Sequence, residues 1–306
     1  MMFFLDTGKT VERRLTGKEE LRCMKRKDLI EALFNAILKE YIRYGCPIKM
    51  VLIGCDGVNS VVAKSLKLTD PKFMPIWATR GFTSYLNGHG LENKLTHVIR
   101  DTVDFGHLTI TDNRVNWFIG RPVLPTDYEK QDHPELIMKL TLDALKVFPK
   151  EFIDTVKQCN LKSFYVTQIK YRAPWDLFFT SFHNGTTTVV GDVMHAMGPF
   201  QGQGAGSSLE DVIVLARCIA KEMCEATKSV GGIGEHQELQ RRIEGALDRY
   251  VKERRLRMIR YSLQTYVAWM LLVDSSMVKK LLALAVFIVF FSGTSLSLTR
   301  YDCGRL

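Results

Sequence analysis

The chain has 306 residues, 46% of them hydrophobic, and a formal net charge of +9. That length can bury one large hydrophobic core or two modest ones. Its basic residues are spread along the chain without a DNA- or RNA-binding signature, which excludes a nucleic-acid partner. The seven cysteines show neither a C-x-x-C pair nor a metal-ligand spacing, so they exclude a metal site of that kind and favour free thiols in a reducing compartment, most simply the cytoplasm.

The first part of the chain contains two helix signals and a short strand. Apolar residues recur at helical spacing over Asp28–Tyr41, which predicts a helix there. Arg26 lies just before this helix, where a cation is mildly unfavourable unless it has a partner. Further on, Met50–Ile53 predicts a short apolar strand, followed by a tight turn over Gly54–Gly57 and a helix that Ser60 can cap.

The middle of the chain has the pattern of a β-sheet. Three stretches are rich in β-branched and aromatic residues with rough alternation: Ile76–Tyr85, His107–Ile119 and Leu161–Tyr171. Asn87-Gly88 and Asp112-Asn113 mark turns, and Pro134–Val156 has the pattern of a helical pair. We expect these strands to form a sheet separate from the layer that holds Met50–Ile53.

A buried strand with a carboxylate at its end follows. Asn184-Gly185 predicts a hairpin turn into Thr186–Val190, whose β-branched run suits a strand in one layer with Met50–Ile53. Asp192 comes directly after this strand, at the end where open α/β sheets bind ligands. A carboxylate at that place suits the hydroxyl groups of a polyol or a ribose better than a phosphate.

A glycine-rich loop and a helix come next. The loop over Gly198–Gly206 contains four glycines, which let the backbone approach a ligand and direct N–H groups at it. Ser207 and Glu210 have the spacing of a capping box, so a helix is predicted behind the loop, with Ser207 at its start. The positive end of that helix favours an anionic or electron-rich ligand.

The C-terminal part is helical by pattern. A long amphipathic stretch runs from residue 239 to about residue 270, and within it Arg249–Arg260 is a basic cluster. Its favoured interpretation is a solvated helix face, with an anionic partner as the alternative. Leu281–Leu298 carries no charge, but its second half is small and polar. A buried or membrane-facing helix over Leu281–Phe291 therefore fits this segment better than a membrane span.

Several of these segments resemble motifs of one enzyme family. Gly191–Asp211 reads GD-x-x-H-x-x-x-P-x-x-GQG-x-x-x-S-x-ED and resembles the second FAD-contacting motif of flavin-dependent aromatic hydroxylases, which include salicylate hydroxylase-like and zeaxanthin epoxidase-like monooxygenases. Gly54–Lys64 resembles the family's G-x-DG-x-x-S element, with lysine in place of its final arginine. Arg26 and Leu29 match an R-x-x-L element, and Arg172–Leu177 resembles the family's return into the flavin domain.

The resemblance implies an α/β fold: an incomplete FAD-binding Rossmann-like domain with an inserted β-sheet substrate domain and C-terminal helices. The expected boundaries are residues 1–68 for the first part of the FAD-binding domain, 69–175 for the substrate-domain sheet, 176–230 for the return of the FAD-binding domain and 231–306 for the C-terminal helical region. The ending Arg300–Gly304 resembles that of plant members, whose C-terminal helices pack on the body.

The resemblance further implies a FAD-dependent monooxygenase that consumes O2 and either NADH or NADPH to hydroxylate or epoxidise a small organic substrate. The residues expected to contact the cofactor are Arg26, Asp56, Gly57, Gly191, Asp192, Pro199, Gly202, Gln203, Gly204 and Ala205. Asp192 is expected to bind the ribityl chain, and the amides of Gly202–Gly206 to stabilise negative charge on the reduced isoalloxazine.

No residue is predicted to be a catalytic acid or base. His195 is interpreted as a packing or hydrogen-bonding residue, with a general base as the alternative. No metal is expected. Membrane contact through residues 281–298 is the less favoured alternative to a cytoplasmic location.

One motif of the family has no counterpart. No G-x-G-x-x-G follows a predicted strand, so the resemblance starts only near Glu20 and the chain resembles a member without its front βαβ unit. Because that unit seats the FAD pyrophosphate in the family, weak FAD binding is expected. The alternative function is a truncated, non-catalytic homologue with weak or no FAD binding.

Overall fold

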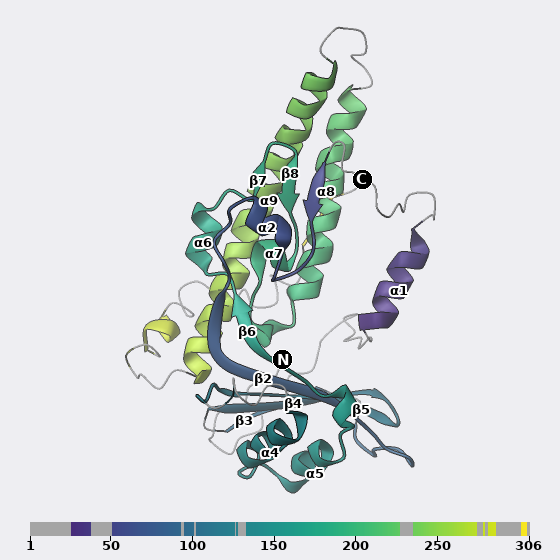
Figure 1. Cartoon of the computed structure of the whole chain (residues 1–306), viewed down its shortest axis with the longest axis vertical. Coiled ribbons are helices and arrows are strands. Elements are labelled where there is room, and N and C mark those ends of the chain that lie inside the picture. The colour runs from purple at the N-terminus through teal and green to yellow at the C-terminus, as the bar shows by residue number, and fades with distance from the viewer. Residues whose placement is uncertain are drawn as a thin grey trace. The chain divides into compact units, whose positions relative to one another are not determined.

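The computed structural model describes residues 26–37, 51–92, 95–100, 102–125, 127, 133–226, 235–273, 278, 281–285 and 301–304 (Figure 1). The chain divides into two compact units. Unit 1 comprises Met1–Cys46 and Pro75–Ile169, and unit 2 comprises Pro47–Met74 and Lys170–Leu306. Each unit therefore joins segments that are far apart in the sequence, and each has its own hydrophobic core.

Unit 1 contains a five-stranded sheet with the strand order β3-β4-β5-β2-β6. Its elements are α1 (Arg26–Ala36), β2 (Lys72–Ser84), β3 (Leu95–Arg100), β4 (Val103–Thr111), β5 (Arg114–Pro122), α4 (Pro134–Ala144), α5 (Lys150–Lys157), η2 (Leu161–Ser163) and β6 (Tyr165–Tyr171). The first three residues of β2 and the last two of β6 belong to unit 2. The pairs β3–β4, β4–β5 and β5–β2 are antiparallel. Buried and half-buried residues alternate along β5, which is the period-2 pattern of a strand with one face on a core.

The core of unit 1 lies between this sheet and the helices α4 and α5 (Figure 1). Phe105 of β4 stacks on Phe152 of α5 with the ring centroids 4.8 Å apart. Trp117 of β5 is fully buried, and its indole N–H donates to Oγ1 of Thr83 at 3.2 Å. The Thr83 hydroxyl in turn donates to the carbonyl of Thr155 at 2.6 Å, so aromatic packing and buried hydrogen bonds together join the sheet to α5.

Unit 2 contains a three-stranded sheet and the two longest helices of the described chain. Its elements are β1 (Leu52–Gly54), α2 (Val61–Ser65), α6 (Pro174–Phe179), β7 (His183–Asn184), β8 (Thr187–Val189), α7 (Asp192–His195), η3 (Pro199–Gln201), α8 (Gly204–Ala226) and α9 (Glu235–Val273). The strand order is β1-β8-β7, with β1 parallel and β7 antiparallel to β8. Tyr250 of α9 is fully buried and donates its hydroxyl to the carbonyl of Val189 at 3.2 Å, so α9 packs against this sheet.

The structure confirms the predicted separation of the strands. The strands predicted around residues 50–53 and 186–190 pair with each other as β1 and β8, and the strands between residues 72 and 171 form the other sheet. The helical pair is confirmed as α4 and α5, and the long amphipathic helix as α9. Helix α1 confirms the first part of the helix predicted over Asp28–Tyr41, and residues 38–41 lie outside the described part of the chain.

Three details of the predictions differ from the structure. Strand β3 was not predicted, because its short segment LTHVIR lacks a sustained alternation. The hairpin turn consists of Gly185 and Thr186, one residue later than predicted, because Asn184 still pairs with Thr187 in the ladder. Helix α8 begins at Gly204 and not at Ser207.

Only part of the predicted C-terminal helix can be compared with the structure. Residues 281–285 are helical, and residues 286–298 lie outside the described part of the chain. Within the described residues, no helix combines the length and the apolar character that crossing a membrane requires.

The contact between β1 and α2 can be tested with a glycine substitution. A Cβ added at Gly54 would lie 2.7 Å from Cβ of Val62 and 3.0 Å from Cγ1 of Val189, so the strand and the helix would have to move apart. We expect Gly54→Ala to lower the free energy of unfolding by about 1–3 kcal/mol, the usual cost of overpacking a core. Urea unfolding followed by circular dichroism measures the change.

Gly245→Ala is the matched control. Gly245 lies inside α9, where an added Cβ would meet only Nη1 of Arg249, at 3.9 Å. Replacing a glycine inside a helix with alanine should raise the free energy of unfolding by about 0.5–1 kcal/mol. If Gly54→Ala were as stable as the parent chain, the packing of β1 on α2 described here would be wrong.

Candidate functional site

Two turns that carry four of the ten predicted cofactor residues leave the same edge of the unit 2 sheet. Strands β1 and β8 pair in parallel, with Gly54 opposite Val189. Parallel neighbours end at the same edge of a sheet, so the turn with Asp56–Gly57 lies beside the turn with Gly191–Asp192. The fold thus brings together two motifs that the sequence places far apart.

In the first turn, the carboxylate of Asp56 holds the start of helix α2. It accepts hydrogen bonds from Oγ of Ser60 at 2.5 Å and from the backbone N–H of Val61 at 2.6 Å. Ser60 caps α2 as predicted, because its Oγ accepts the N–H of Ala63 at 2.9 Å. Burial opposes ionisation of Asp56, but these hydrogen bonds outweigh it and lower the pKa of the carboxyl below its ordinary value. Gly57, with φ +78°, leaves open space where a Cβ would stand.

In the second turn, glycine is required for two reasons. Gly191 has φ +64°, in the left-handed region, and a Cβ added there would lie 2.9 Å from Oγ of Ser208. Asp192 follows at the start of α7 and is exposed. Within the described part of the chain, no hydrogen bond or ion pair occupies its carboxylate. Asp192 is therefore free to accept hydrogen bonds from a ligand.

The second turn is fixed from behind by Asp211 of α8. Its Oδ2 accepts hydrogen bonds from the N–H of Gly191 at 2.8 Å and from Nε2 of His195 at 2.6 Å, and its Oδ1 accepts Nε of Arg254 at 2.6 Å. The side chains of Asp211, His195 and Arg254 have no exposed surface. Burial alone would raise the pKa of Asp211, but His195, Arg254 and the Gly191 N–H together lower it below its ordinary value. The turn is thus held by an ionised, fully buried carboxylate.

Arg254 corrects the interpretation of Arg249–Arg260 as a solvated helix face. Besides Asp211, its guanidinium donates to the carbonyl of Ser207 at 3.2 Å and to Oε2 of Glu210 at 2.8 Å. Burial alone would lower the pKa of Arg254, but the carboxylates of Asp211 and Glu210 raise it above its ordinary value. A charged run on an amphipathic helix gives no sign of a buried ion pair whose partner lies 43 residues earlier, so the sequence pattern did not reveal this residue.

Arg172, in the element that resembles the family's return into the flavin domain, holds the other side of the same turn. It is almost fully buried, and its Nη2 donates to the carbonyl of Val193 at 3.1 Å. Its backbone N–H donates to the carbonyl of Ala196 at 2.8 Å, and its Nη1 donates to the carbonyl of Thr69. Burial lowers the pKa of Arg172, against the opposing effect of nearby carboxylates. Two buried arginines therefore hold the turn. Arg172 bonds its backbone directly, and Arg254 acts on it through Asp211.

The glycine-rich loop enters helix α8 three residues earlier than predicted. Gly202 closes η3 with φ +64°, and α8 begins at Gly204. The N–H of Ser207 already donates to the carbonyl of Gln203 at 2.9 Å, and its buried Oγ finds no hydrogen-bond partner among the described residues. The predicted capping box is therefore wrong. The amides without an intrahelical acceptor are those of residues 204–206, which lie closer to the loop than the prediction placed them.

This loop presents an open stretch of backbone that a flat ligand could approach. A Cβ added at Gly202 or Gly204 would meet nothing within 4 Å, so the backbone there borders open space. Pro199 and Ala205 are exposed, and Gln203 is half-buried. The positive end of α8 then stands behind an accessible surface of backbone, which favours a ligand that carries negative charge.

Nine of the ten residues predicted to contact the cofactor belong to unit 2. They are Asp56, Gly57, Gly191, Asp192, Pro199, Gly202, Gln203, Gly204 and Ala205. The tenth, Arg26, begins α1, and its side chain lies outside the described residues. For all ten, contact with a cofactor stays a prediction.

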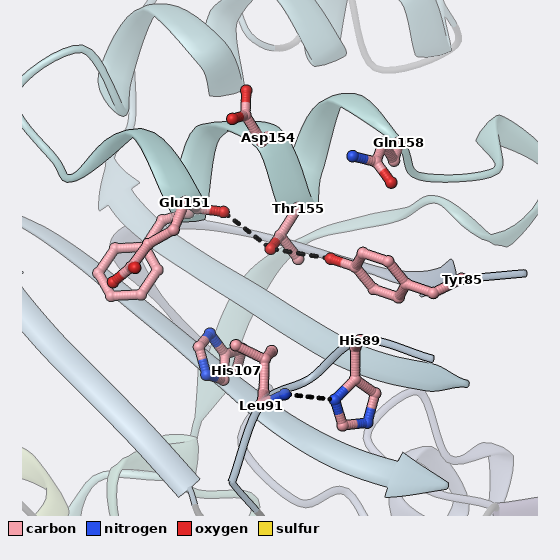
Figure 2. Close-up of a pocket in the computed structure, with 9 residues that line it drawn as sticks. Tyr85, His89, Leu91, His107, Glu151, Asp154, Thr155 and Gln158 are labelled. Atoms are coloured by element: carbon pink, nitrogen blue, oxygen red, sulfur yellow. Dashed lines mark hydrogen bonds between the residues drawn. The ribbon is translucent and has the colours of Figure 1, made fainter. Parts of the chain in front are cut away.

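Unit 1 has a pocket of about 170 Å³ between α5 and the sheet (Figure 2). The residues that line it are Tyr85, His89, Leu91, His107, Glu151, Phe152, Asp154, Thr155 and Gln158. Figure 2 shows the hydroxyl of Tyr85 directed at Thr155, whose Oγ1 accepts it at 3.1 Å and donates to the carbonyl of Glu151 at 2.9 Å. The ring of His89 accepts the N–H of Leu91 at 3.0 Å. These groups fasten the loop after β2 to the helix, and we assign this pocket a packing role.

Comparison with known proteins defines the class to which the chain belongs. A family model described as an FAD binding domain matches residues 51–231. Monooxygenase 1 of Arabidopsis thaliana is 37% identical, with 99% of this chain and 80% of that protein covered. Monooxygenase 2 of the same plant is 31% identical, with 94% of this chain and 75% of that protein covered.

Solved structures share the fold. HpxO of Klebsiella pneumoniae, complexed with FAD and uric acid, has a TM-score of 0.61 at 15% identity and covers 83% of this chain. PqsL of Pseudomonas aeruginosa, a probable FAD-dependent monooxygenase, has a TM-score of 0.52 at 17% identity and covers 77%. The chain spans 61% and 59% of the length of these two structures. The chain belongs to the family of FAD-dependent monooxygenases, which confirms the resemblance of its motifs and the mixed α/β fold.

The Asp211 network predicts how stability depends on pH. The folded-state pKa of Asp211 lies below the value of an unfolded aspartate, which is about 3.9. The stabilisation by this carboxylate is therefore fully present above about pH 4 and is lost as the pH falls through the folded-state pKa. At neutral pH we expect Asp211→Asn to lower the free energy of unfolding by about 3 kcal/mol, because Arg254 would stay buried with only the partly exposed Glu210 as its counter-charge. Urea unfolding between about pH 3 and pH 7 measures both effects.

Asp143→Asn serves as the control for this experiment. The hydrogen bond from Lys146 lowers the pKa of Asp143 too, but this pair is exposed to solvent. Solvent screens such a pair, so the control should unfold almost as the parent does. An Asp211→Asn chain with the parent's stability and the parent's acid response would show that the buried pair does not hold the fold.

Proposed function

We propose that this edge of the unit 2 sheet binds FAD, and that the chain acts as a monooxygenase that uses NADH or NADPH and O2 to hydroxylate or epoxidise a small organic substrate. The observation that carries the proposal is the free, exposed carboxylate of Asp192 at the carboxyl end of β8. It stands at the end of a parallel pair of strands, the usual place of ligands in open α/β sheets. Family membership supports the same assignment.

Each part of the site has a role in this proposal. Asp192 accepts hydrogen bonds from the ribityl hydroxyls, because its oxygens are otherwise unoccupied. The amides of residues 204–206 and the positive end of α8 stabilise negative charge on the isoalloxazine, and Pro199 flanks its edge. When bound, FAD supplies the redox chemistry by which O2 is activated.

His195 takes the hydrogen-bonding role in this proposal. Its side chain has no exposed surface, and Asp211 occupies its Nε2. A general base must come within hydrogen-bond reach of the proton that it removes, which a fully enclosed ring does not. His195 therefore helps to orient the turn, and substrate proton transfer belongs to other groups.

Two structural relatives support a small organic substrate. HpxO forms a complex with uric acid, and PqsL forms a complex with 2-aminobenzoylacetate. Both are small organic molecules, and we propose a substrate of that size for this chain.

The role of Asp192 can be tested by titration with FAD, followed through the flavin fluorescence. Asp192→Ala removes a charged acceptor, and hydrogen bonds to charged groups contribute about 1.5–3 kcal/mol each. We therefore expect the variant to bind FAD about 10- to 150-fold more weakly than the parent chain.

Glu244→Ala is the matched control, because Glu244 is an exposed carboxylate on α9 of the same unit. It should bind FAD as the parent does. Equal affinity of the parent and Asp192→Ala would overturn the proposed geometry. A parent chain that stays colourless at a large excess of FAD would favour the alternative, a non-catalytic homologue.

A further inference from the structure

The residues near the C-terminus contact the helices that support the cofactor turn. The ring of Tyr301 faces two guanidinium groups: its centroid lies 5.0 Å from Cζ of Arg254 and 4.4 Å from Cζ of Arg257. Its hydroxyl donates to Oε1 of Glu253 at 2.9 Å. Tyr301 and Cys303 also pack against the core of unit 2. A segment at the end of the chain thus contacts α9 at the level of the buried ion pair.

A short series of contacts connects Tyr301 to the turn that carries Asp192. The ring contacts Arg254, Arg254 binds Oδ1 of Asp211, and Oδ2 of Asp211 binds the N–H of Gly191. Each of the two interior members of this series is fully buried. A displacement of Arg254 would therefore be passed to the turn, because water has no place in the series to compensate for a lost partner.

The Tyr301 ring lies against a guanidinium whose hydrogen-bonding capacity is not fully used. Nη1 of Arg254 is buried and finds no hydrogen-bond acceptor among the described residues. An aromatic face attracts a guanidinium through its quadrupole, and it does so more strongly where water is excluded. The ring of Tyr301 is thus a further partner for a guanidinium that has two carboxylates but leaves one nitrogen without an acceptor.

Other contacts keep the ring in place. Arg257 binds both carboxylate oxygens of Glu210, each at 2.7 Å, so it is fixed independently of Tyr301. Glu253, which accepts the Tyr301 hydroxyl, is itself bound by Arg217 through both of its oxygens. The hydroxyl bond therefore adds to the packing of the ring against the core of unit 2, and the ring contacts Arg254.

We propose that Tyr301 is a positioning residue for the cofactor site: its ring holds Arg254 in place, and Arg254 acts through Asp211 to fix the backbone turn from Gly191 to His195. What this turn binds rests on the proposed function. The effect of Tyr301 on the turn does not, and it can be measured without flavin.

Amide hydrogen exchange of the parent, Tyr301→Leu and Tyr301→Phe, without added flavin, tests the proposal. The reporting amides are those of Gly191, Met194, His195 and Ala196, which are bonded to Asp211 or within the turn. In Tyr301→Leu we expect them to exchange about tenfold faster, as for the loss of a partly desolvated cation–π contact of ~1.4 kcal/mol. Tyr301→Phe keeps the ring and should stay within about threefold of the parent.

Tyr165→Leu is the matched control, since Tyr165 is an exposed tyrosine of β6 whose ring contacts Arg80 at 4.5 Å in unit 1. It should leave the turn amides unchanged. The amides of Val214 and Leu215 in α8 report on global unfolding. Acceleration of the turn amides alone supports the proposal. Unchanged turn amides in Tyr301→Leu, or an equal acceleration throughout α8, would overturn it.

A flavin titration of the same variants separates this inference from the proposed function. If the parent binds FAD, Tyr301→Leu should bind it about tenfold more weakly, by the same factor as the exchange. A parent that binds no FAD counts against the proposed function, while the exchange measurement still decides the role of Tyr301. The third outcome is that the turn amides of Tyr301→Leu exchange faster while its affinity for FAD equals that of the parent. This outcome would show that Tyr301 does not position the cofactor site.

Discussion

The buried carboxylate of Asp211 is the constraint on which the rest of unit 2 depends. It joins three segments, since its two oxygens bind the turn after β8 and the arginine of α9 while its own backbone belongs to α8. Moving such charges out of water costs several kcal/mol per ion, and good geometry with further hydrogen bonds is needed to offset that cost. Helices α8 and α9 must therefore pack in the one register that places Arg254 opposite Asp211.

This constraint separates the roles of two carboxylates in the same motif. Asp211 is enclosed and fully occupied, whereas Asp192 is exposed and free. Because the buried network and Arg172 hold the backbone between Gly191 and Ala196, the free carboxylate needs no contact of its own to stay in place. A ligand that binds Asp192 then meets a group that is already oriented, which lowers the entropic cost of binding.

The residues that form the turns could be predicted from the sequence, but the residues that support them could not. Gly191 and Asp192 follow a β-branched run and begin a motif with fixed spacing, so the sequence predicts that they lie at the end of a strand. Ser207 was misplaced because a capping-box spacing can occur within a helix that begins earlier, at glycines that propensity disfavours. Arg254 escaped prediction because its partner is distant in the sequence and tertiary contact decides its burial. The predicted domain boundaries stay predictions.

The distance along the chain between Asp211 and Arg254 also has a consequence for biosynthesis. The two residues are 43 positions apart, which a ribosome adding 5–20 residues per second covers in about 2–9 s. During that interval the growing chain already contains the whole glycine-rich motif, yet the aspartate has no arginine to bind. All residues of the motif are thus synthesised before the arginine that fixes their conformation. The turn at Gly191 can therefore reach its final conformation only after Arg254 has been synthesised.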